Sequence, residues 1–184
     1  MGKSTTAKMF EDLGCRVFDA DSAVHRLYAK GGKGAALIKA VFPDAIKDGA
    51  VHRPALAAHM RDDPLNLKVL ESFIHPWVGQ MRADFIRRAE NDGVKAVIFD
   101  IPLLFETGAE RGFDKTIVVS APYAAQRERV LARDGMSEEL FETLLSRQMP
   151  DAEKRKRADY IISTGEGLES AREQVQAVLK DILQ

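Results

Sequence analysis

The sequence begins Met1-Gly2-Lys3-Ser4-Thr5-Thr6, and the helical pattern that follows this stretch decides the fold class. Gly-Lys-Ser is the second half of the phosphate-binding motif G-x-x-x-x-G-K-[ST], which lies between a buried strand and a helix. The glycine lets backbone N–H groups approach phosphate oxygens, and the start of the helix adds partial positive charge. In such a loop Lys3 reaches the outer phosphates and the Ser4 hydroxyl holds Mg²⁺. The stretch therefore predicts a nucleotide-phosphate site.

Only the end of this motif is present, because Met1 fills its last variable place. The leading glycine and the strand before it are absent from the sequence. We expect that strand to belong to the centre of the sheet, and a start codon assigned too late would produce this sequence. Two other interpretations of the stretch stay open. It can be a chance match, and Met1-Gly2-x-x-x-Thr6 also fits an N-myristoylation signal.

Length and composition set further bounds. The chain has 184 residues and a formal net charge of −1, which indicates one domain or one domain with an insertion. Balanced charge does not indicate a polyanion-binding surface, so no nucleic-acid partner is predicted. The single cysteine, Cys15, excludes an internal disulfide and fits a reducing compartment. Without a long apolar run or a signal peptide, we expect a cytoplasmic protein with no membrane partner.

Helices and short apolar strands alternate near the start of the chain, as is typical of α/β proteins. Residues 4–13 have helical spacing and Gly14 is a natural stop. Residues 15–18 read as a buried strand that ends in Asp19-Ala20-Asp21. Because ligands bind outside the carboxyl ends of strands in such sheets, we expect both acids at the ligand face. Alternatively, one of them caps the next helix and the other is solvated.

Later strands repeat this pattern. Residues 94–99 are almost all apolar and end at Asp100, and an apolar strand ending in a carboxylate is typical of a Mg²⁺-binding segment in phosphate-loop enzymes. Further strands are predicted at residues 116–119 and 160–162, followed by an amphipathic helix from Leu168. The sequence predicts an α/β fold with a parallel sheet and helices on both of its faces.

Two helical segments interrupt the α/β pattern. Residues 35–91 are almost all helical and read as an insertion over the ligand face, with a break or kink expected near His75 because Pro76 follows it. From Arg127 to Arg157 cations alternate with apolar residues on helices. These helices either carry charged outer faces or form a mobile lid whose arginines close on phosphates.

Taken in order, these segments resemble the dephospho-coenzyme A kinase family over essentially all 184 residues. The resemblance is carried by Gly2-Lys3-Ser4-Thr5-Thr6, Val17-Phe18-Asp19-Ala20-Asp21, Ile74-His75-Pro76, Pro102-Leu103-Leu104-Phe105-Glu106, Gln148-Met149-Pro150 and Arg157-Ala158-Asp159-Tyr160. The segments at 74–76 and 102–106 are signatures that other nucleoside monophosphate kinases lack. Only the front of the phosphate loop departs from the family pattern.

The resemblance implies a three-layer fold of the P-loop NTPase type and a defined reaction. ATP, with Mg²⁺, would phosphorylate the ribose 3′-hydroxyl of dephospho-coenzyme A in the last step of coenzyme A biosynthesis. The resemblance also implies that Asp21 orients this hydroxyl and accepts its proton, and that Lys3 is catalytic as well. The implied nucleotide contacts are Gly2, Lys3, Ser4, Thr5, Arg133, Arg147 and Gly165. The implied acceptor contacts are Asp21, His75, Pro76 and Leu104, and the implied metal contacts are Ser4 and Asp100.

We further expect a core at about residues 1–30, 94–125 and 158–184. A helical acceptor-binding insertion would occupy about 31–92, and a basic helical lid about 126–157. The chain would be a monomer or a weak homo-oligomer. Two alternatives for function stay open. One is a catalytically impaired, N-terminally truncated form that only binds ligand. The other is a generic nucleoside monophosphate kinase, against which the signatures at 74–76 and 102–106 argue.

Overall fold

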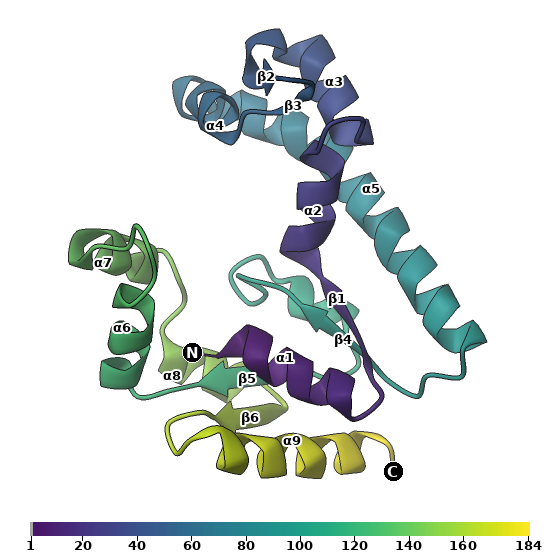
Figure 1. Cartoon of the computed structure of the whole chain (residues 1–184), viewed down its shortest axis with the longest axis vertical. Coiled ribbons are helices and arrows are strands. Elements are labelled where there is room, and N and C mark those ends of the chain that lie inside the picture. Colours follow the sequence, from purple (N-terminus) through teal and green to yellow (C-terminus); the bar gives the residue numbers. More distant parts are fainter. Residues whose placement is uncertain (1) are drawn as a thin grey trace. The chain divides into compact units, whose positions relative to one another are not determined.

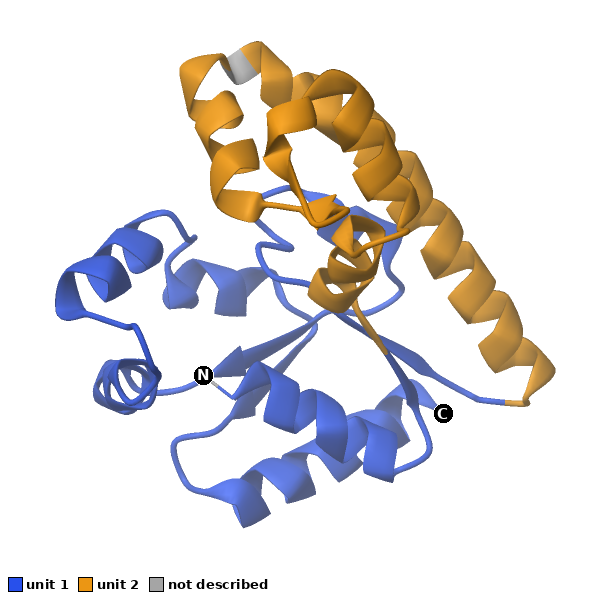
Figure 2. Cartoon of the chain, turned by 45° about the horizontal axis from the view of Figure 1, so that its top comes forward, with its two compact units in different colours: residues 1–17, 94–184 blue, residues 18–93 orange. Residues whose placement is uncertain are grey.

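The chain folds into two compact units in a computed structural model that describes residues 2–184, apart from the side chain of Pro64. Unit 1 combines the N-terminal segment, through Val17, with Val94–Gln184 (Figure 2). Unit 2 is Phe18–Gly93. The insertion predicted for residues 31–92 falls within unit 2, which also takes in the helix that follows Asp19.

Unit 1 contains most of the strands and the two termini (Figure 1). In chain order its elements are α1 Lys3–Asp12, β4 Val97–Asp100, the 3₁₀ turn η2 Ala109–Gly112, β5 Ile117–Ser120, α6 Tyr123–Leu131, α7 Glu138–Ser146, α8 Asp151–Arg157, β6 Tyr160–Ser163 and α9 Leu168–Ile182. Strand β1, Arg16–Asp19, begins in this unit. The basic segment predicted at 126–157 thus forms three short helices.

Among the described residues, the strands of unit 1 form two separate two-stranded sheets. β5 runs parallel to β6, with Ile117 opposite Tyr160 and Ser120 opposite Ser163. β1 and β4 form the other two-stranded sheet, and the Arg16 N–H donates to the carbonyl of Ala96 at 3.4 Å. β1 ends at Asp19 and β4 ends at Asp100, whereas the sequence predicted strands at residues 15–18 and 94–99. The observed strand ends therefore differ from the predicted ones by one to three residues.

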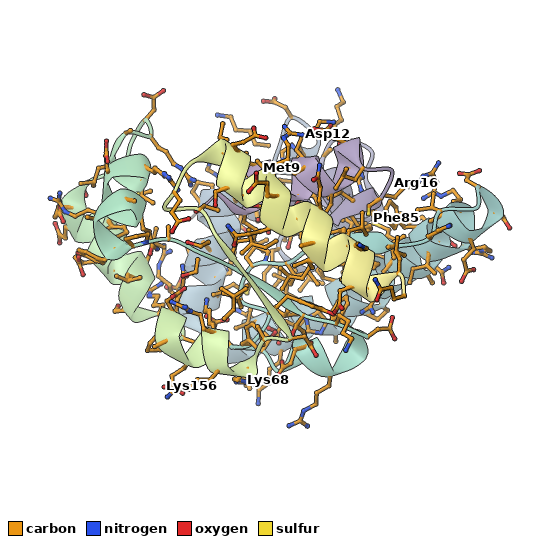
Figure 3. The ribbon with its side chains drawn as sticks, turned by 90° about the horizontal axis from the view of Figure 1, so that it is seen from below. Met9, Asp12, Arg16, Lys68, Phe85 and Lys156 are labelled. Carbon is orange, nitrogen blue, oxygen red and sulfur yellow. The ribbon has the colours of Figure 1, made fainter. Side chains whose placement is uncertain are left out.

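The core of unit 1 lies between α1, the strands and α9. Phe10 and Ile162 are buried at its centre, together with Met9, Cys15, Ala171, Val175, Val178 and Leu179. Helices α1 and α9 lie side by side (Figure 1), and Figure 3 labels Met9 and Asp12 on α1 beside α9. Gly14, at φ 91°, ends α1 as predicted, and the Cys15 N–H then returns to the Phe10 carbonyl at 3.1 Å.

Unit 2 is mostly helical. Its elements are α2 Ala20–Tyr28, α3 Lys33–Val41, the 3₁₀ turn η1 Pro43–Ala45, β2 Ile46–Lys47, β3 Ala50–Val51, α4 Arg53–Asp62 and α5 Pro64–Asn91. The core is formed by buried Ile38, Phe42, Ala45, Leu56, Leu70 and Ile74. The hairpin β2–β3 was not predicted. Its two-residue loop is Asp48-Gly49, both with positive φ, which is the backbone that such tight hairpins require.

Helix α5 corrects one prediction. It is continuous over 28 residues with Pro76 in its interior, so a break near His75 is wrong, while the alternative of a kink there stays a prediction. Proline removes one backbone hydrogen bond and disfavours the helix locally. Here apolar side chains on both sides of Pro76 offset that cost, because Leu70 and Ile74 are buried in the core while Trp77 and Val78 pack against it. Tertiary packing outweighs the local preference.

A half-buried ion pair holds two distant segments of unit 1 together. The Glu106 carboxylate accepts hydrogen bonds from the Met149 N–H and from Lys154 Nζ, both at 2.8 Å. Nearby, Arg157 pairs with Glu110. Burial alone would raise the pKa of Glu106, but the bonds from Lys154 and Met149 outweigh it, so this pKa lies below its ordinary value. The matched segments at 102–106 and 148–157 are therefore in direct contact.

We predict that Ile162→Ala lowers the free energy of unfolding by about 2–5 kcal/mol, because it leaves a cavity in the fully buried core of unit 1. Ile161→Ala, at the next position on β6, is the matched control, because Ile161 is 38% exposed and its truncation should cost much less. Urea unfolding of both variants measures the difference. Equal losses would show that the core is not centred on Ile162.

We also predict a pH-dependent role for Glu106. Since its folded pKa is depressed, its stabilisation is complete above its ordinary pKa of 4.5 and is lost as the pH falls through the folded value. The unfolding free energy of the wild type should therefore fall more steeply through this range than that of Glu106→Gln. Glu153→Gln, an exposed glutamate on α8, should follow the wild type. Parallel curves for wild type and Glu106→Gln would contradict the assignment.

Candidate functional site

The stretch predicted to bind phosphate forms the start of α1. Gly2 precedes the helix with φ 87°, a conformation that glycine adopts without strain. No side chain caps this end of α1, so its first N–H groups point outward with the positive end of the helix dipole. Ser4 and Thr5 follow and are exposed. Met1, expected to fill the last variable place of the motif, lies outside the described residues.

Lys3 meets Asp100, and this contact unites two predicted site residues that are far apart in the sequence. Lys3 Nζ pairs with Asp100 Oδ1 at the carboxyl end of β4. The Asp100 side chain is only 8% exposed, whereas that of Lys3 is 44% exposed. A buried carboxylate is costly without a partner, so the lysine compensates the charge of Asp100 while it remains accessible to solvent.

The turn after β6 lies next to this stretch. Gly2 is adjacent to Thr164, whose N–H donates to the Ser120 carbonyl at 2.8 Å. A side chain at Gly165 would lie 2.7 Å from Pro122 Cδ, so the close approach of Pro122 requires glycine there. From α6, Arg129 donates to the Thr164 carbonyl at 2.9 Å. The turn is thereby fixed between the start of α1 and the basic helices.

Arg129 was not among the predicted site residues. It lay within the basic run, but nothing in the sequence separated it from its neighbours. The two arginines that were singled out, Arg133 and Arg147, are exposed, and neither side chain has a hydrogen bond or ion pair among residues 2–184. The structure thus places Arg129 against Thr164 and leaves Arg133 and Arg147 at the surface.

A polar cavity of about 430 Å³ opens beside the same turn in unit 1. Its lining includes Ser120, Tyr123, Gln126, Asp151, Arg155 and Ser163. The Ser120 hydroxyl donates to Asp151 Oδ2 at 2.7 Å, while Asp151 Oδ1 is buried without a hydrogen-bond partner in the described structure. Since both strands of the β5–β6 pair end here, the cavity lies where α/β sheets bind ligands.

In unit 2 the paired acids at the end of β1 take different roles. Asp19 is the N-cap of α2 and accepts hydrogen bonds from the Ser22 N–H at 3.0 Å and from its hydroxyl at 2.8 Å. Asp21 lies in the first turn of α2 and is exposed. Its carboxylate has no hydrogen bond or ion pair within the part of the chain that the structure describes. One acid caps the helix and the other is left to accept a proton or a hydrogen bond.

Asp21 lines a second cavity, of about 620 Å³, within unit 2. Helix α2 contributes Asp21, His25 and Tyr28 to it, and α4 contributes Arg53, Leu56 and Met60. His75 and Pro76, expected at the acceptor, are exposed on α5 and are not among the residues that line this cavity. Leu104, also expected there, is half-buried in unit 1.

The two units therefore offer different chemistry. In unit 1 a lysine, hydroxyl groups and a helix N-terminus suit the phosphates of a nucleotide. In unit 2 an unpaired carboxylate, a guanidinium and apolar side chains suit an organic acceptor that carries a hydroxyl and an anionic group. None of the helices in residues 2–184 combines the length and apolar character needed to cross a membrane.

Comparison with known proteins identifies the relatives of this chain. The model of a protein family described as dephospho-CoA kinase matches residues 1–169. A dephospho-CoA kinase of Mesorhizobium japonicum is 49% identical over 99% of this chain and 91% of its own length. One of Bradyrhizobium diazoefficiens is 47% identical over 100% of this chain and 91% of its own length.

Solved structures agree with the sequence matches. A Thermus thermophilus crystal structure superposes with a TM-score of 0.85 at 33% identity, over 100% of this chain and 92% of that chain. The dephospho-CoA kinase of Campylobacter jejuni superposes with a TM-score of 0.71 at 27% identity, over 98% of this chain and 91% of that chain. These matches confirm the predicted α/β fold of the P-loop kinase type. With the family match along most of its length, the chain belongs to the dephospho-CoA kinase family.

Proposed function

We propose that this chain transfers the γ-phosphoryl group of ATP to the ribose 3′-hydroxyl of dephospho-coenzyme A, giving coenzyme A and ADP in the last step of coenzyme A biosynthesis. The observation that carries the proposal is the pairing of Lys3 with buried Asp100 at the start of α1, in a chain of this family. Such a transfer asks the protein for alignment and charge stabilisation more than for covalent chemistry.

In the nucleotide half, Gly2, Lys3, Ser4 and Thr5 hold the phosphates of ATP at the start of α1. The turn at Gly165 and the polar cavity beside it receive the base. Arg133 and Arg147 are exposed cations of the lid that can close on phosphate. The Ser4 hydroxyl and the Asp100 carboxylate are hard oxygen donors that suit Mg²⁺, which when bound neutralises charge on the outer phosphates.

In the acceptor half, Asp21 orients the 3′-hydroxyl and accepts its proton as the phosphoryl group moves. Its support is the absence of a competing partner among residues 2–184, which leaves its carboxylate oxygens available to the substrate. The cavity beside Asp21 holds the rest of the acceptor. We also propose acceptor contacts from three residues that do not line this cavity, His75, Pro76 and Leu104.

We propose a division of labour along the chain. A core of about residues 1–30, 94–125 and 158–184 carries the reaction, an insertion at about 31–92 binds the acceptor, and a lid at about 126–157 covers ATP. We propose a cytoplasmic monomer or weak homo-oligomer with no nucleic-acid or membrane partner. Gel filtration with light scattering would test the oligomeric state.

A panel of acceptors tests the substrate assignment. With Mg-ATP, the purified chain should release ADP with dephospho-coenzyme A and not above background with AMP, CMP or UMP. Faster turnover of a nucleoside monophosphate would favour the generic kinase. Binding of dephospho-coenzyme A without any turnover would favour the catalytically impaired form.

We predict that Asp21→Asn lowers kcat by about 10²- to 10⁴-fold, because the amide cannot accept the hydroxyl proton. The KM for ATP should stay within about threefold of the wild type, since Asp21 is not assigned to the nucleotide. Asp62→Asn, an exposed aspartate on α4, is the matched control and should leave turnover unchanged. Near-normal kcat in Asp21→Asn would remove this residue from the reaction.

Lys3→Met should lower kcat/KM for ATP by about 10²-fold or more, because it removes a fixed cation from the phosphates. It also leaves Asp100 without its partner, so circular dichroism must first show that the variant is folded. The control is Lys8→Met on the same helix, where the lysine pairs with Glu11 at the surface. A loss of similar size in both variants would show that the effect is not specific to Lys3.

A further inference from the structure

We propose that Arg53, positioned by His25, binds the diphosphate group of the acceptor and so selects a diphosphate-bearing nucleotide over a simple nucleoside. This inference rests on the proposed function, because it assigns a part of the acceptor to one side of the cavity in unit 2. Neither residue was singled out as a site residue from the sequence. Both line the same cavity as Asp21.

Two aromatic side chains fix the Arg53 guanidinium at the cavity. Arg53 Nη2 donates to His25 Nδ1 at 3.5 Å, and the nitrogen must be the acceptor because a guanidinium carries only donors. The guanidinium carbon also lies 5.8 Å from the centre of the Tyr28 ring, within cation–π distance. Burial raises the pKa of Tyr28, against the charge of Arg53, so the ring beneath the guanidinium stays neutral.

The charge of Arg53 is not neutralised within the protein. No carboxylate forms an ion pair or a hydrogen bond with it in residues 2–184, although Asp21 lines the same cavity. Arg53 is exposed and is the first residue of α4, whose N-terminal end has no side-chain cap. The positive end of the α4 dipole therefore adds to the guanidinium charge, and both favour an anion.

The spacing along α2 matches the acceptor. His25 follows Asp21 by four positions, so the two side chains lie on one face about one helical turn apart. In dephospho-coenzyme A, the reacting 3′-hydroxyl and the 5′-linked diphosphate are on the same ribose, separated by a short run of bonds. With the hydroxyl at Asp21, the diphosphate reaches the guanidinium beside His25. The apolar side chains Leu56 and Met60 then face the uncharged part of the acceptor.

Direct binding tests this assignment without requiring turnover. Calorimetric titration with dephospho-coenzyme A alone should give a Kd about 10- to 100-fold weaker for Arg53→Met than for the wild type, since a charge-assisted pair to phosphate is lost. Arg53→Lys should lie between them, because it keeps the charge and loses the planar fork. Arg61→Met, an exposed arginine near the end of α4 and outside the cavity lining, is the matched control and should bind like the wild type.

Kinetics separate a binding role from a structural one. In Arg53→Met the KM for dephospho-coenzyme A should rise by the same factor as the Kd, while kcat at saturation and the KM for ATP change by less than about threefold. His25→Ala, which removes the group that orients Arg53, should raise the same KM by a smaller factor. Unchanged binding in Arg53→Met, or an equal loss in Arg61→Met, would overturn the inference.

These outcomes are distinct from failure of the proposed function. Coenzyme A formed at equal KM by the wild type and Arg53→Met would overturn the role of Arg53 and leave the reaction intact. Arg53-dependent binding in a wild-type chain that makes no coenzyme A would support the role of Arg53 and count against the reaction. A wild-type chain that neither binds nor converts dephospho-coenzyme A would overturn both.

Discussion

The ion pair between Lys3 and Asp100 is the contact on which the proposed nucleotide site depends. Asp100 is buried at the end of β4, and a buried carboxylate without a cation would destabilise the fold. The lysine that compensates it follows Gly2 at the uncapped start of α1. The lysine that compensates Asp100 in the fold is therefore the same lysine that we propose for phosphate binding.

Unit 1 is held in this arrangement by other contacts far from the loop. Glu106 ties the segment after β4 to Met149 and Lys154, and Arg129 ties α6 to the turn at Thr164. Glu106 accepts from a backbone N–H and pairs with a lysine. Arg129 donates to both the backbone carbonyl and the hydroxyl of Thr164. The basic helices are thus attached to the core by a few polar contacts, while their outer arginines stay exposed. Such an attachment is compatible with the lid that we propose for this segment.

Local patterns in the sequence predicted what depends on neighbours in the chain. The helix ended by Gly14, the apolar strands and the division of Asp19 and Asp21 into a cap and a free acid all follow from short-range chemistry. What depends on tertiary packing was missed: α5 continues through Pro76 because core contacts flank it, and Arg53 meets His25 only through the packing of α4 against its neighbours. The β2–β3 hairpin was missed although Asp48-Gly49 is a turn signal that the sequence displays.

The reaction assigned to this chain is tested most directly by following phosphorus through it. Phosphorus NMR of the chain with Mg-ATP and dephospho-coenzyme A reports every phosphate species at once. We predict a new phosphomonoester resonance, coupled to the ribose H3′ proton, that grows in step with ADP while no inorganic phosphate accumulates. ATP that stays intact, or ADP that appears together with inorganic phosphate and no phosphomonoester, would contradict transfer to the 3′-hydroxyl.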